Sequence, residues 1–236
     1  MANRVSIHLA GREIVADDAQ TILDVARANG VFIPTLCHFA GLSSVGACRL
    51  CVVEIRGVSR LATACTTYVR DGMEITVDSP RLAGYRRTLV ELLLAERNHV
   101  CAVCVANGAC ELQTLAQALG VTHTRYAYRY PKYAVDASHP RFVYDANRCV
   151  LCTRCVRVCA EVEGAHTWDV IYRSSAARVA CDLDVPWGEA QSCTACGKCV
   201  RVCPTGALAD KGLAVGERPV HADFLAALQA GRRQAR

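Results

Sequence analysis

Two copies of one cysteine pattern, C-x2-C-x2-C-x3-C, lie in the second half of this 236-residue chain and constrain its fold most strongly. The first copy runs from Cys149 to Cys159, and the second, displaced by 44 residues, runs from Cys193 to Cys203. Three closely spaced thiolates on a tight loop can hold three irons of a cubane, whereas the fourth opens a helix that points away. The pattern therefore predicts two [4Fe–4S] clusters with crossed ligation.

Crossed ligation gives each cluster three cysteines from one copy and the last cysteine of the other copy, as the spacing of bacterial two-cluster ferredoxins requires. One cluster takes Cys149, Cys152, Cys155 and Cys203, and the other takes Cys159, Cys193, Cys196 and Cys199. Zinc is the alternative, but zinc sites use four tetrahedral ligands, usually as two separated pairs. A run of four cysteines followed by its duplicate fits zinc poorly.

A separate group of four cysteines lies in the first third of the chain and consists of Cys37, Cys48, Cys51 and Cys65. Four thiolates suit a [2Fe–2S] cluster, and Gly41 and Gly46 in the same loop allow backbone amides to approach the sulfides. A rubredoxin-like iron site or a zinc site would use the same ligands. The duplicated pattern further along the chain favours the [2Fe–2S] cluster.

A third group is one cysteine short, because it contains only Cys101, Cys104 and Cys110. His99 lies two residues before the first of them and is the candidate fourth ligand of a third [4Fe–4S] cluster. The alternative is that His99 stabilises the end of the preceding helix, where a cation is favourable. Water, a carboxylate or a distant side chain would then complete the ligand set.

One cysteine, Cys181, is left over in a strand pattern, where a buried thiol acts as a small apolar side chain. We assign it no metal. The other fifteen cysteines and His99 supply four ligands to each of four clusters. Their thiolates offset the formal net charge of +5, so nucleic-acid binding loses its main support. The six other histidines are expected to be surface or packing residues.

Composition excludes several classes of protein. Hydrophobic residues make up 52% and charged residues 21%, which excludes disorder as the main state. No apolar run approaches the ~20 residues that span a bilayer, and residues 1–15 lack an export signal, so we expect a cytoplasmic protein without a membrane partner. In a reducing compartment, sixteen cysteines are expected to bind metal rather than to form disulfides.

The order of expected elements is typical of an α+β fold. A hairpin is expected over residues 4–15, followed by a helix that Thr21 and Asp24 cap. Short strands are expected at 52–55, 60–62 and 74–77, and helices at 81–97, 111–119 and 220–236. The apolar stripe of the 81–97 helix includes Tyr85 and Leu92.

The cysteine groups and the composition divide the chain into five segments. The expected boundaries are 1–79 for the [2Fe–2S] domain, 80–124 for a helical His-Cys domain, 125–140 for a linker, 141–212 for the two-[4Fe–4S] domain and 213–236 for a helical tail.

Taken together, the motifs resemble the electron-input arm that is shared by the complex I large iron–sulfur subunit, [FeFe] hydrogenases and the diaphorase part of NAD-reducing [NiFe] hydrogenases. The resemblance covers about residues 1–210. The segment from Glu96 to Gly108 and the short chain after Cys203 most resemble the small (gamma) diaphorase subunit of the bidirectional [NiFe] hydrogenase. The chain departs from the superfamily pattern at Arg97, where a histidine is usual.

The resemblance implies a β-grasp [2Fe–2S] ferredoxin domain, a small helical His-Cys cluster domain and a two-[4Fe–4S] ferredoxin-like domain. It implies a subunit that relays electrons between a flavin/NAD(H)-binding diaphorase subunit and the small and large subunits of a [NiFe] hydrogenase. FMN, NAD and the nickel–iron site are expected only on those partners. The chain itself carries no G-x-G-x-x-G fingerprint, so no catalytic site is expected on it.

Two other functions stay open on the sequence. The chain could be an iron–sulfur accessory subunit of an NAD-linked formate dehydrogenase or of an [FeFe] hydrogenase. A zinc-binding interaction protein is the alternative from a different class.

Overall fold

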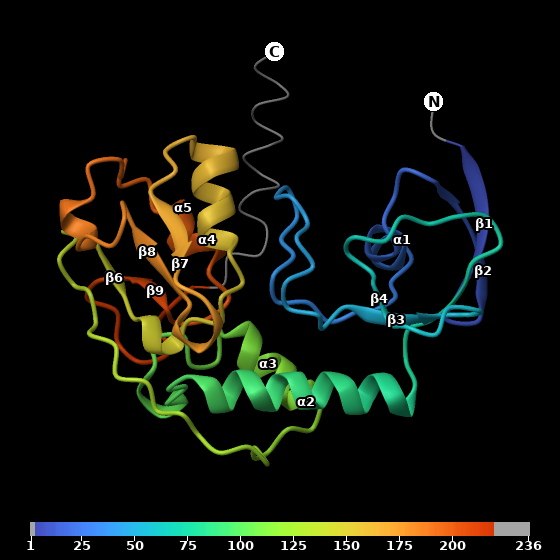
Figure 1. Cartoon of the computed structure of the whole chain (residues 1–236), viewed down its shortest axis with the longest axis horizontal. Helices are drawn as coiled ribbons and strands as arrows, with labels where there is room; N and C mark the ends of the chain where they lie inside the picture. The colour runs from blue at the N-terminus through green and yellow to red at the C-terminus, as the bar shows by residue number, and fades with distance from the viewer. Residues whose placement is uncertain (1–2, 220–236) are drawn as a thin grey trace. The chain divides into compact units, whose positions relative to one another are not determined.

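The computed structural model describes residues 3–219, which form two compact units of mixed helix and strand (Figure 1). Within the described residues, unit 1 consists of 3–38 and 44–89, and unit 2 consists of Phe39–Ser43 and 90–219. The short segment Phe39–Ser43 thus belongs to unit 2, although it lies inside the first cysteine loop of the sequence. The domain boundaries expected from the sequence remain predictions.

Unit 1 is built on a five-stranded sheet in the order β2-β1-β5-β3-β4. The strands are β1 (Arg4–Leu9), β2 (Arg12–Asp17), β3 (Val52–Ile55), β4 (Ala62–Thr63) and β5 (Glu74–Thr76). The β1–β2 hairpin expected from the sequence is confirmed, and its turn residues Ala10 and Gly11 have φ values of 52° and 76°. The strand expected at 60–62 was misplaced, because the pairing with β3 begins only at Ala62.

Helix α1 (Ile22–Ala28) packs its apolar side chains into the core of unit 1. The expected capping box is present: Thr21 Oγ1 accepts from the Asp24 N–H at 3.2 Å, and the Asp24 carboxylate accepts from the Thr21 N–H at 3.0 Å. The cap satisfies two N–H groups that the first turn would otherwise leave without partners.

Helix α2 (Pro80–Glu96) runs from unit 1 into unit 2. Its buried Arg86 donates hydrogen bonds to the carbonyl oxygens of Leu50, Val52 and Val77 at 2.8–3.2 Å. These three bonds connect the helix to the start of β3 and to the residue that follows β5.

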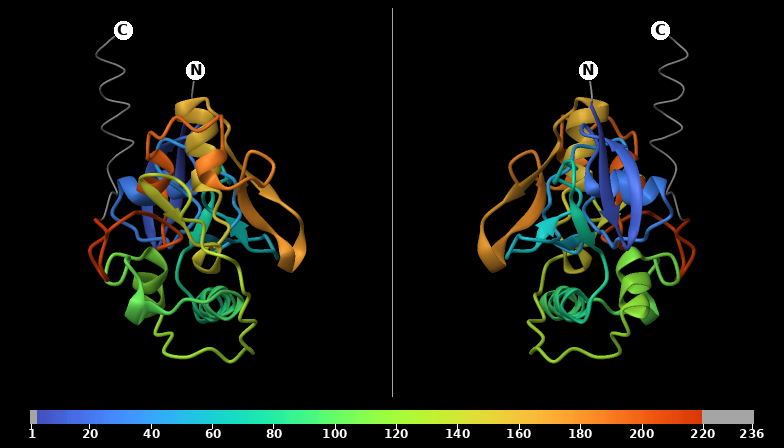
Figure 2. Two further views of the ribbon diagram at one scale, coloured as in Figure 1. Left: turned by 90° about the vertical axis from the view of Figure 1, so that its left-hand side faces the viewer. Right: turned by 90° about the vertical axis from the view of Figure 1, so that its right-hand side faces the viewer.

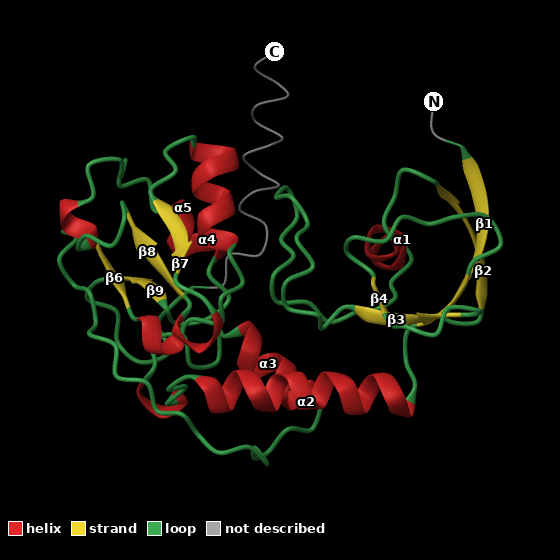
Figure 3. Cartoon of the chain, in the orientation of Figure 1, coloured by secondary structure: helices red, strands yellow, loops and turns green. Residues whose placement is uncertain are grey.

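Unit 2 contains short elements joined by long loops (Figure 3). Its helices are α3 (Glu111–Ala118), α4 (Arg154–Arg157) and α5 (Lys198–Val202), with a π-helix at Val158–Glu163 and 3₁₀ turns at Cys101–Val103, Ala146–Arg148, Ser174–Ala176 and Trp187–Glu189. Two antiparallel pairs join β6 (Phe142–Tyr144) to β9 (Leu208–Asp210), and β7 (Trp168–Ile171) to β8 (Arg178–Cys181). Figure 2 shows the β7–β8 pair, in orange, as a hairpin.

The core of unit 2 is rich in aromatic and cysteine side chains. Trp187 stacks on Phe142 with ring centroids 5.3 Å apart, and it meets Trp168 edge-on at 4.9 Å. Phe39 and Leu42 from the segment Phe39–Ser43 are buried in the same core.

Within residues 3–219 no helix is long and apolar enough to cross a membrane. Residues 213–219 lie in turns and extended backbone, and the helix expected over 220–236 lies outside the described residues.

Candidate metal centres

The four cysteines of unit 1 lie with their sulfur atoms close together. The Sγ atoms of Cys51 and Cys65 are 3.4 Å apart. The N–H of Leu36 donates to Cys48 Sγ at 3.4 Å, and the N–H of Cys48 donates to Cys37 Sγ at 3.5 Å. Hydrogen bonds from the thiols of Cys48 and Cys65 lower the pKa of Cys37. The structure thus brings together the set expected for [2Fe–2S], with amide donors directed at sulfur.

In unit 2, each of the two crossed ligand sets lines a cavity of its own. One cavity, with an empty volume of about 340 Å³, is lined by Cys149, Cys152, Cys155 and Cys203. The other, of about 300 Å³, is lined by Cys159, Cys193, Cys196 and Cys199. We refer to them as the first and second ferredoxin cavities. The last cysteine of each copy lies at the cavity of the other copy, which is the arrangement expected from the spacing.

Both copies follow the same backbone path around their cavities. Leu151 and Ala195 occupy equivalent places between the first two cysteines, with φ values of 51° and 54°. Thr153 and Gly197 follow the second cysteine, with φ values of 58° and 72°. These left-handed residues turn the chain sharply before α4 and α5 begin. The same turn presents three thiols of each copy to one cavity.

A third cavity, with an empty volume of about 290 Å³, is lined by His99, Cys101, Cys104 and Cys110. The Nε2 atom of His99 is buried and has no hydrogen-bond partner. Burial lowers the pKa of His99 to about 4, and a hydrogen bond to the backbone of Leu93 opposes this shift. The imidazole is therefore neutral near pH 7, which is the form that binds metal.

Arg97, which stands where the superfamily pattern usually has histidine, plays a different part. Its guanidinium is buried and donates from Nη2 to the carbonyl oxygen of Ala177 at 2.8 Å. It also lies over the ring of Tyr133, 5.2 Å from the centroid. The imidazole at the third cavity comes from His99, as the sequence led us to expect.

Gly206 closes one side of this third cavity. A Cβ atom at this position would lie 2.5 Å from Cys104 Sγ, so any larger residue would push the sulfur away. Glycine allows the backbone to approach the thiol this closely.

The donor sets fit iron–sulfur clusters. None of the sixteen cysteines forms a disulfide. Burial raises the pKa of Cys149 to about 11 and that of Cys152 to about 12, so their thiolates need a positive partner such as a cluster iron. The cysteines surround cavities, and within residues 3–219 no group of three or more His, Cys, Asp or Glu side chains could hold a lone metal ion.

Comparison with known protein families divides the chain in the same order as its cysteine groups. Residues 2–80 match a 2Fe-2S iron-sulfur cluster binding domain. Residues 86–125 match the NADH-ubiquinone oxidoreductase-G iron-sulfur binding region, and residues 140–209 match the ferredoxin-like domain of NADH-quinone oxidoreductase subunit 3. The chain therefore contains one [2Fe–2S] domain and further iron–sulfur binding regions.

The NAD-reducing hydrogenase HoxS subunit gamma of Cupriavidus necator is 33% identical over 182 residues, which cover 77% of each protein. The chain belongs to the family of this gamma subunit. A chain in the crystal structure of NAD⁺-reducing [NiFe]-hydrogenase in the H2-reduced state matches with a TM-score of 0.82 and 36% identity. That match covers 89% of this chain and 88% of the other.

Longer proteins carry the same region as one part of their length. The NADPH-Fe(3+) oxidoreductase subunit alpha of Geobacter sulfurreducens is 38% identical over 215 residues, which are 91% of this chain. This gamma-family chain spans about 25% of the length of that relative.

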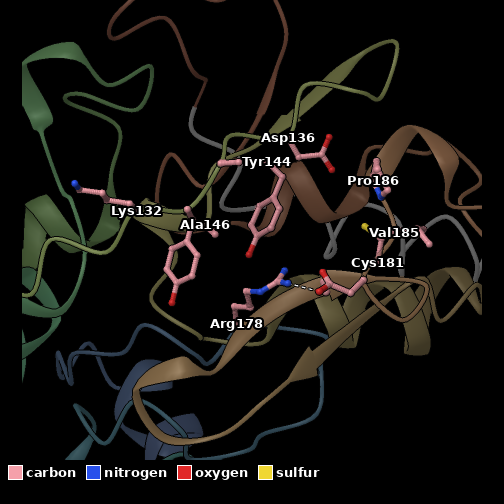
Figure 4. A pocket seen from close by; sticks show the side chains of 12 residues that line it. Lys132, Asp136, Tyr144, Ala146, Arg178, Cys181, Val185 and Pro186 are labelled. Carbon is pink, nitrogen blue, oxygen red and sulfur yellow. Dashed lines mark hydrogen bonds and ion pairs between the residues drawn. The ribbon is translucent and has the colours of Figure 1, made fainter.

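Cys181 is the cysteine left over from the four predicted ligand sets. It is buried at the end of β8, in agreement with its expected strand position, and burial raises the pKa of its thiol. It lines a larger cavity, with an empty volume of about 1000 Å³, together with Lys132, Tyr144 and the ion-paired Arg178 and Asp184 (Figure 4). Cys181 therefore lines none of the three cavities that are surrounded by a predicted ligand set.

Two groups of residues near the ferredoxin cavities were not identified from the sequence. Buried arginines contact the backbone of two cysteines of the first cavity: Arg157 donates to the carbonyl oxygen of Cys152 at 3.1 Å, and Arg218 donates to that of Cys203. At the second cavity, Trp168 and Trp187 line the wall. For Trp168 and Trp187, the only signal in the sequence was that the chain has just two tryptophans.

Proposed function

We propose that this chain is the electron-relay subunit of a hydrogen:NAD⁺ oxidoreductase. Electrons would pass through it between a flavin/NAD(H)-binding diaphorase subunit and the small and large subunits of a [NiFe] hydrogenase. The observation that carries this proposal is the gathering of the predicted ligands into four separate sets in a chain of the gamma-subunit family.

The ligand assignment is part of the same proposal. One [2Fe–2S] cluster would be held by the four cysteines of unit 1, and one [4Fe–4S] cluster by the set lining each of the three cavities of unit 2. Each of the three cavities is lined by one complete four-residue set, which supports one cofactor in each cavity.

The finer architecture follows from the same reasoning. We infer a β-grasp fold for residues 1–79, because the strand order β2-β1-β5-β3-β4 has β1 and β5 as parallel neighbours and α1 packs against the sheet. A cytoplasmic location follows from the expected need for reduced thiols.

When bound, the clusters supply one-electron transfer, and the chain's own residues hold them in place and keep water away. Most of the proposed ligands are buried, including Cys37, Cys51, Cys104, Cys155 and Cys199. Burial fixes the thiols and lowers the local dielectric, and both effects set the potential at which an electron is accepted. Flavin, NAD and nickel chemistry belong to the partners.

Separating the two half-reactions in the complex tests the relay. We expect an affinity-tagged chain to purify with a flavin subunit and hydrogenase subunits. In that complex, Cys104→Ser should abolish hydrogen-driven NAD⁺ reduction, while NADH-driven and hydrogen-driven dye reduction by the partners persist.

Cys181→Ser is the matched control and should leave all three activities intact, because Cys181 lines no cluster cavity. Full hydrogen-driven NAD⁺ reduction in a Cys104→Ser complex that has lost iron would contradict the relay. Purification with formate dehydrogenase subunits instead would reassign the partner.

A further inference from the structure

The indole of Trp187 directs its only polar atom at a proposed cluster ligand. Its Nε1 atom lies 3.3 Å from Cys193 Sγ, within hydrogen-bonding distance for sulfur. An indole N–H can donate but cannot accept, so the sulfur must be the acceptor. The contact therefore favours the negatively charged thiolate form of Cys193.

The other tryptophan, Trp168, also lines the second ferredoxin cavity. Trp168 and Trp187 are 3% and 1% exposed, so water does not compete for their N–H groups. The first ferredoxin cavity has no counterpart, because the chain has only two tryptophans and both lie at the second cavity.

The position of Trp187 is fixed from several sides. Its backbone N–H donates to Asp136 Oδ2 at 2.6 Å, and the next N–H, of Gly188, donates to Ser138 Oγ at 2.7 Å. A Cβ at Gly188 would lie 2.6 Å from the carbonyl oxygen of Ser138, so only glycine permits this approach. The indole also packs against the rings of His139 and Phe142. Such support holds the N–H donor in one orientation.

We propose that Trp187 raises the reduction potential of the cluster in the second ferredoxin cavity above the value that its cysteines alone would give. The inference rests on the proposed function, because it requires a cluster at Cys193. Reduction adds one electron to the cluster, taken from a partner subunit or from a chemical reductant, and no protein bond breaks. The indole keeps its proton, and its hydrogen bond stabilises the extra negative charge on sulfur.

The test is a redox titration of the full chain, followed by electron paramagnetic resonance, on the parent and on Trp187→Phe. The variant should show a lower potential for the second-cavity cluster only. At a fixed potential, the ratio of oxidised to reduced cluster should rise roughly tenfold, which is about 59 mV for a one-electron couple. The cluster of the first cavity in the same sample is the internal control.

A smaller ring could disturb packing, so a second variant replaces Trp187 by benzothienylalanine, which keeps the bicyclic shape and lacks the N–H. An equal fall in potential in this variant supports the hydrogen bond as the cause. An unchanged potential with all irons retained overturns the inference and leaves the relay intact. Absence of iron–sulfur signals from the parent would instead refute the proposed function.

Discussion

The two copies of the cysteine pattern share one backbone path, but different side chains surround their cavities. Near the first cavity lies Arg154, which is 2% exposed and donates to the Glu111 carboxylate at 2.5 and 2.8 Å. Its equivalent in the second copy is Lys198, which is partly exposed and ion-paired with Glu163. At the second cavity, the indole N–H of Trp187 lies 3.3 Å from Cys193 Sγ instead.

This comparison distinguishes the residues that place the thiols from the residues that set the charge around them. The repeated residues place the thiols, because both copies use left-handed turns at equivalent positions. The residues that differ between the copies set the electrostatic surroundings, with the buried guanidinium of Arg154 near one cavity and the neutral N–H donor of Trp187 at the other. The shared backbone path therefore accounts for the similar geometry of the two cavities, and the side chains that differ lead us to expect unequal reduction potentials.

Cys203→Ser should have the largest effect on cluster content, because it removes the ligand that the second copy contributes to the first cavity. Cys203 belongs to the second copy but lines the first cavity. We expect the variant to lose or convert the cluster associated with Cys149, Cys152 and Cys155, and to keep the other ferredoxin cluster. Spectroscopy and iron analysis check the result against Cys181→Ser. Loss of the second-cavity cluster would mean that each copy binds its own cluster.

His99→Cys extends the comparison to the third cavity. Replacement of a neutral imidazole by a thiolate adds one negative charge, so the cluster should become harder to reduce by roughly 100 mV or more, judging from Rieske centres. His123→Cys, in an exposed loop, makes the same chemical change away from the cavity and should leave every potential unchanged. An unaltered potential in His99→Cys with four irons retained at this site would refute the ligand assignment.

Arg154→Met sharpens the contrast between the two ferredoxin cavities. Burial raises the pKa of Cys152 to about 12, and the charge of Arg154 opposes that shift. Removal of this charge should lower the potential of the first-cavity cluster, on the order of 60 mV for a tenfold change in the redox ratio. Arg154→Lys keeps the charge and should shift the potential less. A fall confined to the second-cavity cluster would contradict the assignment of Arg154 to the first.

Gly197→Ala addresses the one place where the shared turn uses glycine. With φ at 72° and Phe142 Cζ 3.0 Å from the added Cβ, alanine should be strained and crowded. We expect a loss of stability of about 1–2 kcal/mol from the left-handed conformation and a further loss from the contact. Gly212→Ala, with φ at 82° and open space around it, should lose stability only because of the left-handed conformation. Equal melting temperatures for the two variants would show that the Phe142 contact is unimportant.

Local features of this fold were predictable from the sequence. The grouping of cysteines, the Thr21 cap and the first hairpin depend on residues close together in the chain, so spacing and capping rules apply to them. The crossed arrangement was also accessible from the sequence, because the duplicated spacing separates the last cysteine of each copy from the tight loop of the first three, and this cysteine lines the other cavity.

Long-range contacts were not predictable in the same way. The stripe expected on α2 included Tyr85 and Leu92, which are 40% and 42% exposed, whereas Arg86 and Glu91 are buried. Arg86 is buried because it meets carbonyl groups 9 to 36 residues away in sequence. The contact between Trp187 and Cys193 spans six residues, and it was not predicted either, because it depends on the path of the loop between them.

The most direct test of the account is the metal content of the full chain after anaerobic purification. One [2Fe–2S] and three [4Fe–4S] clusters predict about fourteen irons and as many acid-labile sulfides per chain, with no stoichiometric zinc. Zinc at two or more atoms per chain without sulfide would contradict the account, because it would convert the four ligand sets into structural zinc sites.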